Sequence, residues 1–114
     1  MTPEAKVKAA VCKRLDAFGA YYFKPTTGGY GVSGLFDIVA VVHGRFIGIE
    51  TKATCKQQPT GLQSRNAKLA RTAGAATLLI HEGNIDKLES LLRRVINDES
   101  TRIDRESVWP VDRD

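Results

Sequence analysis

The sequence predicts an α/β fold in which a mixed central β-sheet is flanked by helices. Three observations lead to this expectation. Residues 2–18 and 84–96 carry apolar side chains at helical spacing, residues 35–42 and 45–52 are typical of two strands around a tight turn, and residues 75–80 form another short apolar run. In chain order the expected elements are α-β-β-β-α-β-α.

The first helix is expected to follow Thr2 and to end at Gly19. Thr2 can cap it, Pro3 suits its first position, and Glu4 complements the helix dipole. Its apolar stripe consists of Val7, Val11, Leu15 and Phe18. Glu4 precedes the first of these by three residues and the second by seven, so it continues the buried stripe. Residues 20–24, which are short and aromatic, are expected to form the first strand.

A loop with four glycines over residues 26–34 leads into a β-hairpin. Counting outward from the turn at His43 and Gly44 places Asp37 opposite Glu50, and Lys52 points to the same face two residues later. Two carboxylates directly opposite each other lie roughly 4.5–5.5 Å apart at their Cβ atoms and repel. A divalent metal would offset this repulsion, and an adjacent lysine would help.

The remaining elements are expected to complete the sheet and cover it. Residues 38–42 are apolar without alternation, which is typical of a strand covered on both faces. Residues 62–73 are expected to form a helix and residues 75–80 a buried strand. Asn84 or Asp86 is expected to cap the final helix.

The bulk composition is that of one domain, expected over residues 1–96, followed by a charged extension over residues 97–114 that is either flexible or docked. The length of 114 residues is close to the commonest domain size. No apolar run approaches the ~20 residues that span a bilayer, and no signal peptide is recognisable. Cys12 and Cys55 form neither a metal spacing nor a disulfide framework, so we expect reduced thiols in an intracellular, cytoplasmic protein.

The charge balance modestly favours a polyanionic partner. The chain has 17 basic and 13 acidic residues, which gives a net charge of +4. Polar side chains in and near the glycine-rich loop, in the connection after the hairpin and on the helix expected over residues 62–73 are the candidates for DNA contact, although charged helix faces are often merely solvated. These candidates are Lys24, Tyr30, Ser33, Lys56, Arg65, Lys68 and Arg71.

The chemistry of the hairpin residues suits phosphodiester hydrolysis. Carboxylate oxygens such as those of Asp37 and Glu50 are hard ligands that suit Mg²⁺ or Mn²⁺, and the backbone carbonyl of Thr51 could add a further ligand. Lys52 could orient or deprotonate a water, or stabilise developing negative charge. Glu4 could approach from the first helix and hold an outer or second metal.

The order Asp37, Glu50, Lys52 on a β-hairpin resembles the core of the PD-(D/E)XK nuclease superfamily. More narrowly, residues 2–92 resemble a stand-alone VRR-NUC domain of the small phage and bacterial type. The further matching positions are Glu4 on the first helix, Gly34 at the hairpin entry, and Gln63 eleven residues before Gly74. Two positions depart from the pattern: Phe36 stands where the family often has proline, and Thr51 where it usually has valine.

The resemblance implies an αβββαβ restriction-endonuclease-like core and a Mg²⁺- or Mn²⁺-dependent DNA endonuclease. By this likeness Asp37 and Glu50 bind metal, Lys52 is catalytic, and Glu4 belongs to the metal shell. Gln63 would orient the attacking water or a catalytic side chain. The resemblance also implies a substrate such as a Holliday junction or other branched DNA. It further implies a homodimer, to whose interface the apolar final helix could contribute. The small stand-alone type implies a phage protein in a bacterial host.

Several alternatives stay open at this point. Asp37 and Glu50 could be solvent-facing charges at strand ends, and Glu4 could serve only the helix dipole. Thr60 and Gln63 fit a capping box, which is compatible with a role in the site. The whole chain could also be a non-catalytic DNA-binding module of the same fold, or a nuclease without a preference for DNA structure.

Overall fold

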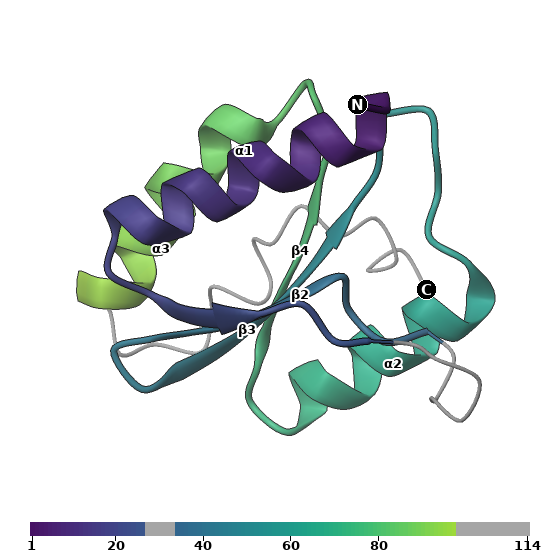
Figure 1. The fold of residues 1–114 in the computed structure, drawn as a ribbon. Coiled ribbons are helices and arrows are strands. Elements are labelled where there is room, and N and C mark those ends of the chain that lie inside the picture. The colour runs from purple at the N-terminus through teal and green to yellow at the C-terminus, as the bar shows by residue number, and fades with distance from the viewer. Residues whose placement is uncertain (27–33, 98–114) are drawn as a thin grey trace.

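The computed structural model describes residues 1–26 and 34–97 of the chain. In this part four strands form one sheet, with α1 and α3 on one face and α2 on the other (Figure 1). The elements in chain order are α1 (Pro3–Ala17), β1 (Tyr21–Phe23), β2 (Ile38–Val42), β3 (Arg45–Thr51), α2 (Gly61–Thr72), β4 (Ala76–Ile80) and α3 (Ile85–Asn97). None of these helices is long and apolar enough to cross a membrane.

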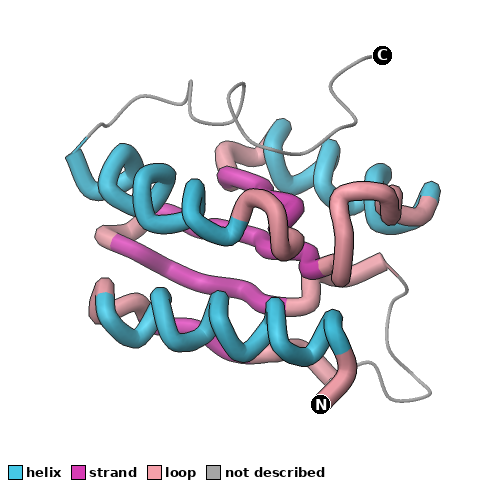
Figure 2. Tube along the Cα trace, turned by 90° about the horizontal axis from the view of Figure 1, so that it is seen from above, coloured by secondary structure: helices cyan, strands magenta, loops and turns pink. Residues whose placement is uncertain are grey.

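The sheet is mixed, with strand order β1-β2-β3-β4. The pairs β1–β2 and β2–β3 are antiparallel, whereas β3 and β4 run parallel. A parallel neighbour requires a crossover connection, which α2 provides. Figure 2, the view from above, looks onto the face of the sheet over which α1 and α3 lie side by side. The expected α/β fold with a mixed sheet flanked by helices is confirmed.

The turn of the β2–β3 hairpin determines how the two strands pair. His43 and Gly44 both have positive φ, 49° and 79°, as tight two-residue hairpin turns require. Val42 therefore pairs with Arg45 and the ladder continues from there, as counted from the sequence. β2 begins at Ile38 rather than at residue 35, because the residues before it turn away from the ladder.

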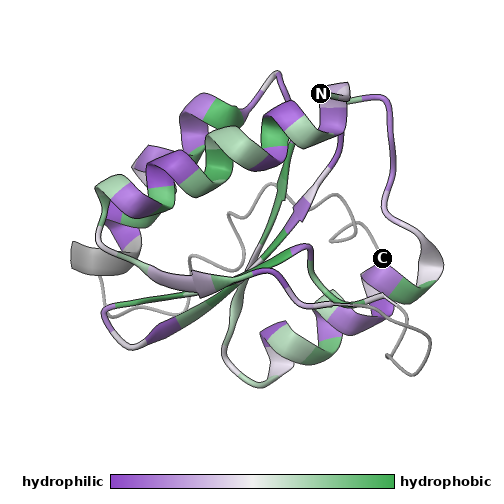
Figure 3. Ribbon diagram, viewed as in Figure 1, coloured by the Kyte–Doolittle hydropathy of each residue, from purple (hydrophilic) through white to green (hydrophobic). Residues whose placement is uncertain are grey.

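The larger part of the core lies between the sheet and the helices α1 and α3. Its residues come from α1 (Val7, Val11, Leu15), the strands (Ile38, Ala40, Val42, Ile47, Ile49, Ala76, Leu78, Ile80) and α3 (Leu88, Leu91, Leu92). The hydrophobic stripes of these helices face the sheet and their polar sides face outward (Figure 3). The apolar residues of α3 named here are thus used within the domain.

A smaller core lies under α2 and is built around Phe36. Phe36 packs with Val39, Ala67 and Leu79. A Cβ atom at Gly48 would overlap the Phe36 ring, so the glycine makes room for it. Phe36 therefore has a structural role under α2.

The entry to the hairpin lies directly against the first turn of α2. Gly34 has φ +83°, and a Cβ atom there would lie 2.6 Å from the carbonyl oxygen of Leu62. Only a residue without a side chain fits both the backbone conformation and the space. Gly34 thus holds the N-terminus of α2 beside the segment that carries Asp37.

The helix ends follow the sequence signals at two of three N-termini. The hydroxyl of Thr2 accepts the N–H of Ala5 at 3.1 Å, and Thr60 forms a capping box with Gln63. Asn84 directly precedes α3, but its side chain accepts the N–H of His81 and donates to the carbonyl of Leu79. It therefore stabilises the turn between β4 and α3.

Candidate active site

Asp37 and Glu50 lie at one end of the sheet, where β2 begins and β3 ends. The ladder ends at the pair Ile38–Ile49, and Asp37 and Glu50 are the next residue on each side. Asp37 itself lies in a bend outside the ladder. Its Oδ2 accepts hydrogen bonds from the backbone N–H and the hydroxyl of Thr51, at 2.8 and 3.0 Å. These bonds hold the carboxylate beside the end of β3.

Glu50 carries the most perturbed carboxyl group of the site. It is 1% exposed, and neither of its carboxyl oxygens has a hydrogen-bond partner among the described residues. Burial raises the pKa of Glu50 from 4.5 to about 9, with Asp37 adding to the rise and Lys52 opposing it. Glu50 is therefore protonated at neutral pH when no cation is bound.

Asp37 is shifted in the opposite direction. Burial on its own would raise its pKa, but Glu50, the two donors of Thr51 and the charge of Lys8 together hold the pKa below its ordinary value. The Lys8 ammonium lies 3.9 Å from Oδ1. The pKa values of two adjacent carboxyls are thus shifted in opposite directions, an arrangement that is common where acids are brought together for chemistry.

The donor set of this pair fits a hard divalent cation. A buried carboxyl with unpartnered oxygens is costly, and a bound cation would satisfy it. No group of three or more His, Cys, Asp or Glu side chains comes together within residues 1–26 and 34–97. In this part of the chain the pair could therefore offer two acidic ligands, a number that Mg²⁺ often takes together with water and phosphate oxygens.

Lys52 follows this pair at the end of β3. Its backbone N–H donates to the carbonyl of Ile80 at 2.9 Å, which fixes the residue against β4. Its side chain is partly buried, and its charge is near enough to Glu50 to lower the pKa of that carboxyl. A cation beside two carboxyls is suited to stabilise negative charge that develops there.

Glu4 interacts electrostatically with Glu50, whereas Gln63 forms hydrogen bonds with Thr60 at the start of α2. The carboxylate of Glu4 is near enough to raise the pKa of Glu50, although its contribution is the smallest of those named for that group. The Oε1 of Gln63 accepts the N–H of Thr60 at 2.8 Å. Gln63 thus forms the capping box in this structure, and its role in catalysis stays a prediction, as does that of the Thr51 carbonyl.

Two contacts of the site were not foreseen from the sequence. Lys8 reaches Asp37 from α1, and the Thr51 hydroxyl binds Asp37 in addition to the backbone. Lys8 lies one helical turn after Glu4, a spacing that places both on one flank of a helix. That signal was present, but the sequence alone does not say which flank of α1 crosses the end of the sheet.

The candidates for DNA contact are spread over the surface. Lys24, Lys56, Arg65 and Lys68 are exposed. Arg71 is partly buried, and its guanidinium donates to the hydroxyl of Thr77 at 2.8 Å. Tyr30 and Ser33 lie outside the described residues, as does the extension after residue 97.

Cys12 and Cys55 are both free thiols.

Comparison with known proteins shows the fold. No protein-family model matches the sequence, and a search of curated proteins finds no match. A search of solved structures finds similarity to one described as "VRR_NUC domain", with a TM-score of 0.65 and 21% sequence identity. The similarity covers 88% of this chain and 100% of that one. The chain therefore has the fold of a VRR-NUC domain, a nuclease-type α/β fold, as the sequence resemblance predicted.

Proposed function

We propose that this protein is a divalent-metal-dependent DNA endonuclease that cuts branched or otherwise structured DNA. The observation that carries the proposal is the carboxyl pair at the end of the sheet. Glu50 is buried with unpartnered oxygens beside the ionised Asp37, and both stand next to Lys52 in a nuclease-type fold. A surface with no function has no need of this costly arrangement.

Asp37, Glu50 and the carbonyl of Thr51 would hold Mg²⁺ or Mn²⁺, with Glu4 in an outer shell or at a second ion. A bound ion of this kind polarises a phosphodiester and lowers the pKa of a coordinated water. Lys8 and Thr51 keep Asp37 in place, so the carboxylate needs little reorganisation when substrate arrives. Because Glu50 must release its proton before it binds a cation, cation binding is expected to release protons.

Lys52 would act on the reacting phosphate or water. In hydrolysis the oxygen of water loses a proton and forms a bond to phosphorus, negative charge builds on the phosphate, and the bond from phosphorus to the leaving oxygen breaks. The leaving oxygen takes up a proton from solvent. The ammonium of Lys52 stabilises that charge, or its neutral amine takes the proton of the water. Gln63 would orient the water after giving up its bond to Thr60.

The DNA partner and the assembly are parts of the same proposal. The net charge of +4 favours a duplex backbone, with Lys24, Lys56, Arg65 and Lys68 as contacts. A homodimer would place two identical sites on the two symmetric strands of a junction. The described apolar residues of α3 are buried in the domain core, so the dimer is proposed on the family resemblance alone. We also propose residues 1–96 as the nuclease domain, with residues 97–114 as an extension, in an intracellular protein.

Cleavage of labelled DNA tests the activity and the substrate together. Purified protein is incubated with four-way junction, flap and linear duplex substrates of the same sequence, with Mn²⁺, Mg²⁺ or EDTA. We expect cleavage with either metal, none with EDTA, and faster cleavage of branched than of linear DNA. Equal rates on all substrates would show that the protein is a nuclease without a preference for DNA structure. No cleavage of any substrate would refute the proposed nuclease activity.

A non-catalytic DNA-binding module of the same fold is the alternative. The engagement of Gln63 in the capping box favours it, because a residue expected in the site is used for helix stability. The module predicts DNA binding that is independent of metal. Calorimetric titration with Mn²⁺ separates the two functions: the enzyme requires a binding heat that Glu50→Gln abolishes, and the module shows none.

A further inference from the structure

The face of the sheet that carries α2 is only partly covered. α2 packs over Phe36, Val39 and Leu79. Among the described residues, no helix covers β1 and the neighbouring part of β2 on this face (Figure 1). Large apolar side chains are consequently exposed here: Tyr21 is 70% exposed, Phe23 49% and Phe46 41%.

The strand register shows that these side chains form one surface. Tyr21 pairs with Val41, and Val41 pairs with Phe46, so the three project from the same side of the sheet. Phe23 pairs with Val39, which belongs to the core under α2. We call Tyr21, Phe23, Val41 and Phe46 the open sheet face.

The open sheet face lies on the same side of β3 as Glu50, and Phe36 under α2 lies between the two. Phe46 and Glu50 are four residues apart on β3, so they project from the same side of the strand. At about 3.3 Å per residue the two positions are roughly 13 Å apart. A nucleic-acid strand that is cut at Glu50 can therefore extend over Phe46 within a few nucleotides.

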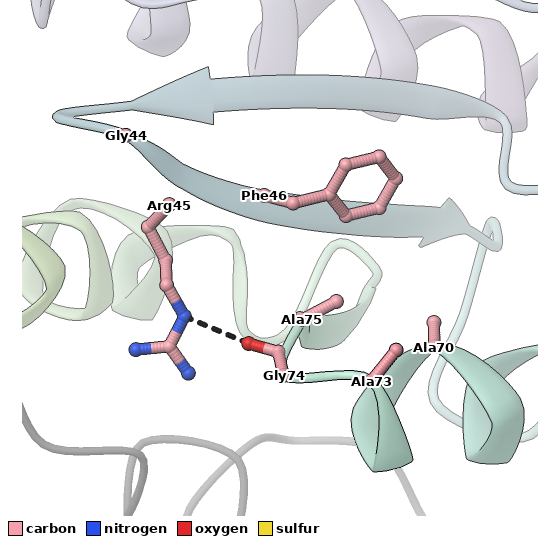
Figure 4. Close-up of a pocket in the computed structure, with 7 residues that line it drawn as sticks. All are labelled: Gly44, Arg45, Phe46, Ala70, Ala73, Gly74 and Ala75. Carbon is pink, nitrogen blue, oxygen red and sulfur yellow. Dashed lines mark hydrogen bonds between the residues drawn. The ribbon is translucent and has the colours of Figure 1, made fainter.

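A groove beside Phe46 adds depth to this surface. It has a volume of about 450 Å³ and lies between Phe46 and the alanines 70 and 73 near the end of α2 (Figure 4). Arg45 lies at its edge, where its Nε donates to the carbonyl of Gly74 at 3.1 Å. An aromatic wall, a wall of small side chains and a guanidinium at the edge suit a flat, anionic ligand.

The charges around the open sheet face complement a polyanion. α2 has Arg65, Lys68 and Arg71 and no acidic residue. Lys24 follows β1 and is exposed. Exposed aromatic rings with basic residues around them are the combination that proteins use to bind unpaired nucleotides, since bases stack on rings while cations hold the phosphates.

We propose that the open sheet face binds unpaired nucleotides next to the cleaved bond, with their bases stacked on Tyr21, Phe23 and Phe46. This inference rests on the proposed nuclease function and names the substrate feature that the enzyme would select. The rings of Tyr21 and Phe23 meet edge to face, with centroids 6.4 Å apart and planes at 60°. They therefore do not stack on each other, and a ring face is left for a base.

Binding without metal tests this proposal separately from cleavage. Fluorescence anisotropy in EDTA compares a blunt duplex with the same duplex carrying a six-nucleotide single-stranded tail. We expect the tail to tighten binding by the parent protein roughly tenfold or more. The double variant Tyr21→Leu, Phe46→Leu keeps apolar side chains but removes two rings, so the advantage of the tail should largely disappear.

The matched control is the double variant Tyr21→Phe, Phe46→Tyr, which keeps both rings and should keep the advantage of the tail. Equal binding of tailed and blunt duplex by the parent would overturn the proposal, as would an unchanged advantage in the leucine variant.

Light scattering tests whether a second copy of the chain occupies the open sheet face instead. If the parent is a dimer that the leucine variant dissociates, the face belongs to a second copy of the chain and the proposal fails. Loss of cleavage with the tail preference intact would refute the nuclease and leave this surface standing.

Discussion

At the scale of single residues, the state of Glu50 dominates the site. A carboxyl that is almost fully buried and has unpartnered oxygens destabilises the protein when it is charged, so it keeps its proton. Asp37 avoids this outcome because Thr51 and Lys8 stabilise its charge. Two carboxyls that lie side by side thus titrate in different pH ranges.

The pKa of Glu50 predicts how the stability of the metal-free protein depends on pH. The folded state has a pKa of about 9 against 4.5 for an ordinary glutamate, so between these values the folded state binds more protons than the unfolded state. The free energy of unfolding should fall as pH rises through this window, by at most about 1.4 kcal/mol per pH unit. Asp37 does not alter this trend, because its lowered pKa acts only below 3.8.

Denaturant melts in EDTA from pH 5 to pH 8 check this prediction. Glu50→Gln should flatten the decline and be more stable than the parent protein at pH 8. Glu89→Gln, on the exposed side of α3, is the matched control and should follow the parent. A decline of equal slope in the Glu50→Gln variant would show that another group is responsible.

The hydroxyl of Thr51 is predicted to stabilise the ionised Asp37. Thr51→Val keeps the shape of the side chain and the backbone donor but removes the 3.0 Å hydrogen bond. The free energy of unfolding should fall by about 1–3 kcal/mol, as expected for a hydrogen bond to a charged group. Chemical denaturation measures this loss. The control Thr72→Val removes an exposed hydroxyl that donates to the carbonyl of Lys68, and should cost less than half as much.

At the scale of secondary-structure elements, the contact between the hairpin entry and α2 places the site. Gly34 has a positive φ, and its Cα faces the backbone of Leu62. We predict that Gly34→Ala destabilises the protein by about 1–3 kcal/mol, because strain and overlap with a rigid backbone add. The control is Gly61→Ala, where a Cβ would meet open space, and it should be neutral or slightly stabilising.

Thermal melts of both variants test whether Gly34→Ala is less stable than Gly61→Ala. A Gly34→Ala protein as stable as the Gly61→Ala protein would mean that α2 is free to move away from the hairpin. A destabilised Gly34→Ala protein that still cleaves DNA normally would show that the placement of α2 matters for folding and not for the site.

The elements that the sequence predicts well are those set by local chemistry. The turn at His43 and Gly44 determines the hairpin register, from the pair Val42–Arg45 to the pair Ile38–Ile49. The ends of α1 and α2 follow from Thr2 and Thr60. Each of these signals acts within a few residues, so no knowledge of the tertiary fold is needed to interpret them.

The features that the sequence does not reveal depend on packing between distant segments. Phe36 turns under α2 rather than extending β2, and Asn84 binds back to β4 rather than capping α3. Lys8 meets Asp37 only because α1 crosses the end of the sheet. These contacts join residues on different elements, and the order of the strands decides them.

At the scale of the whole molecule, the two faces of the sheet differ. Within residues 1–26 and 34–97, one face is closed by α1 and α3, whereas α2 covers the other only in part and leaves exposed aromatic rings on the same side as Glu50. A large exposed apolar surface on a small protein is typical of a binding site. We therefore propose that the open sheet face and the carboxyl pair, which lie on the same side of β3, act on the same nucleic acid.

Cleavage of a labelled four-way junction in Mn²⁺ by the parent and two aspartate variants tests the central claim most directly. Asp37→Asn removes a charge from the carboxyl pair, and Asp86→Asn makes the same change at an exposed carboxylate of α3. We expect Asp37→Asn to fold and to lower the rate by roughly a hundredfold or more, and Asp86→Asn to cleave like the parent. Equal cleavage by all three proteins would contradict the claim that the carboxyl pair at the end of the sheet is the active site.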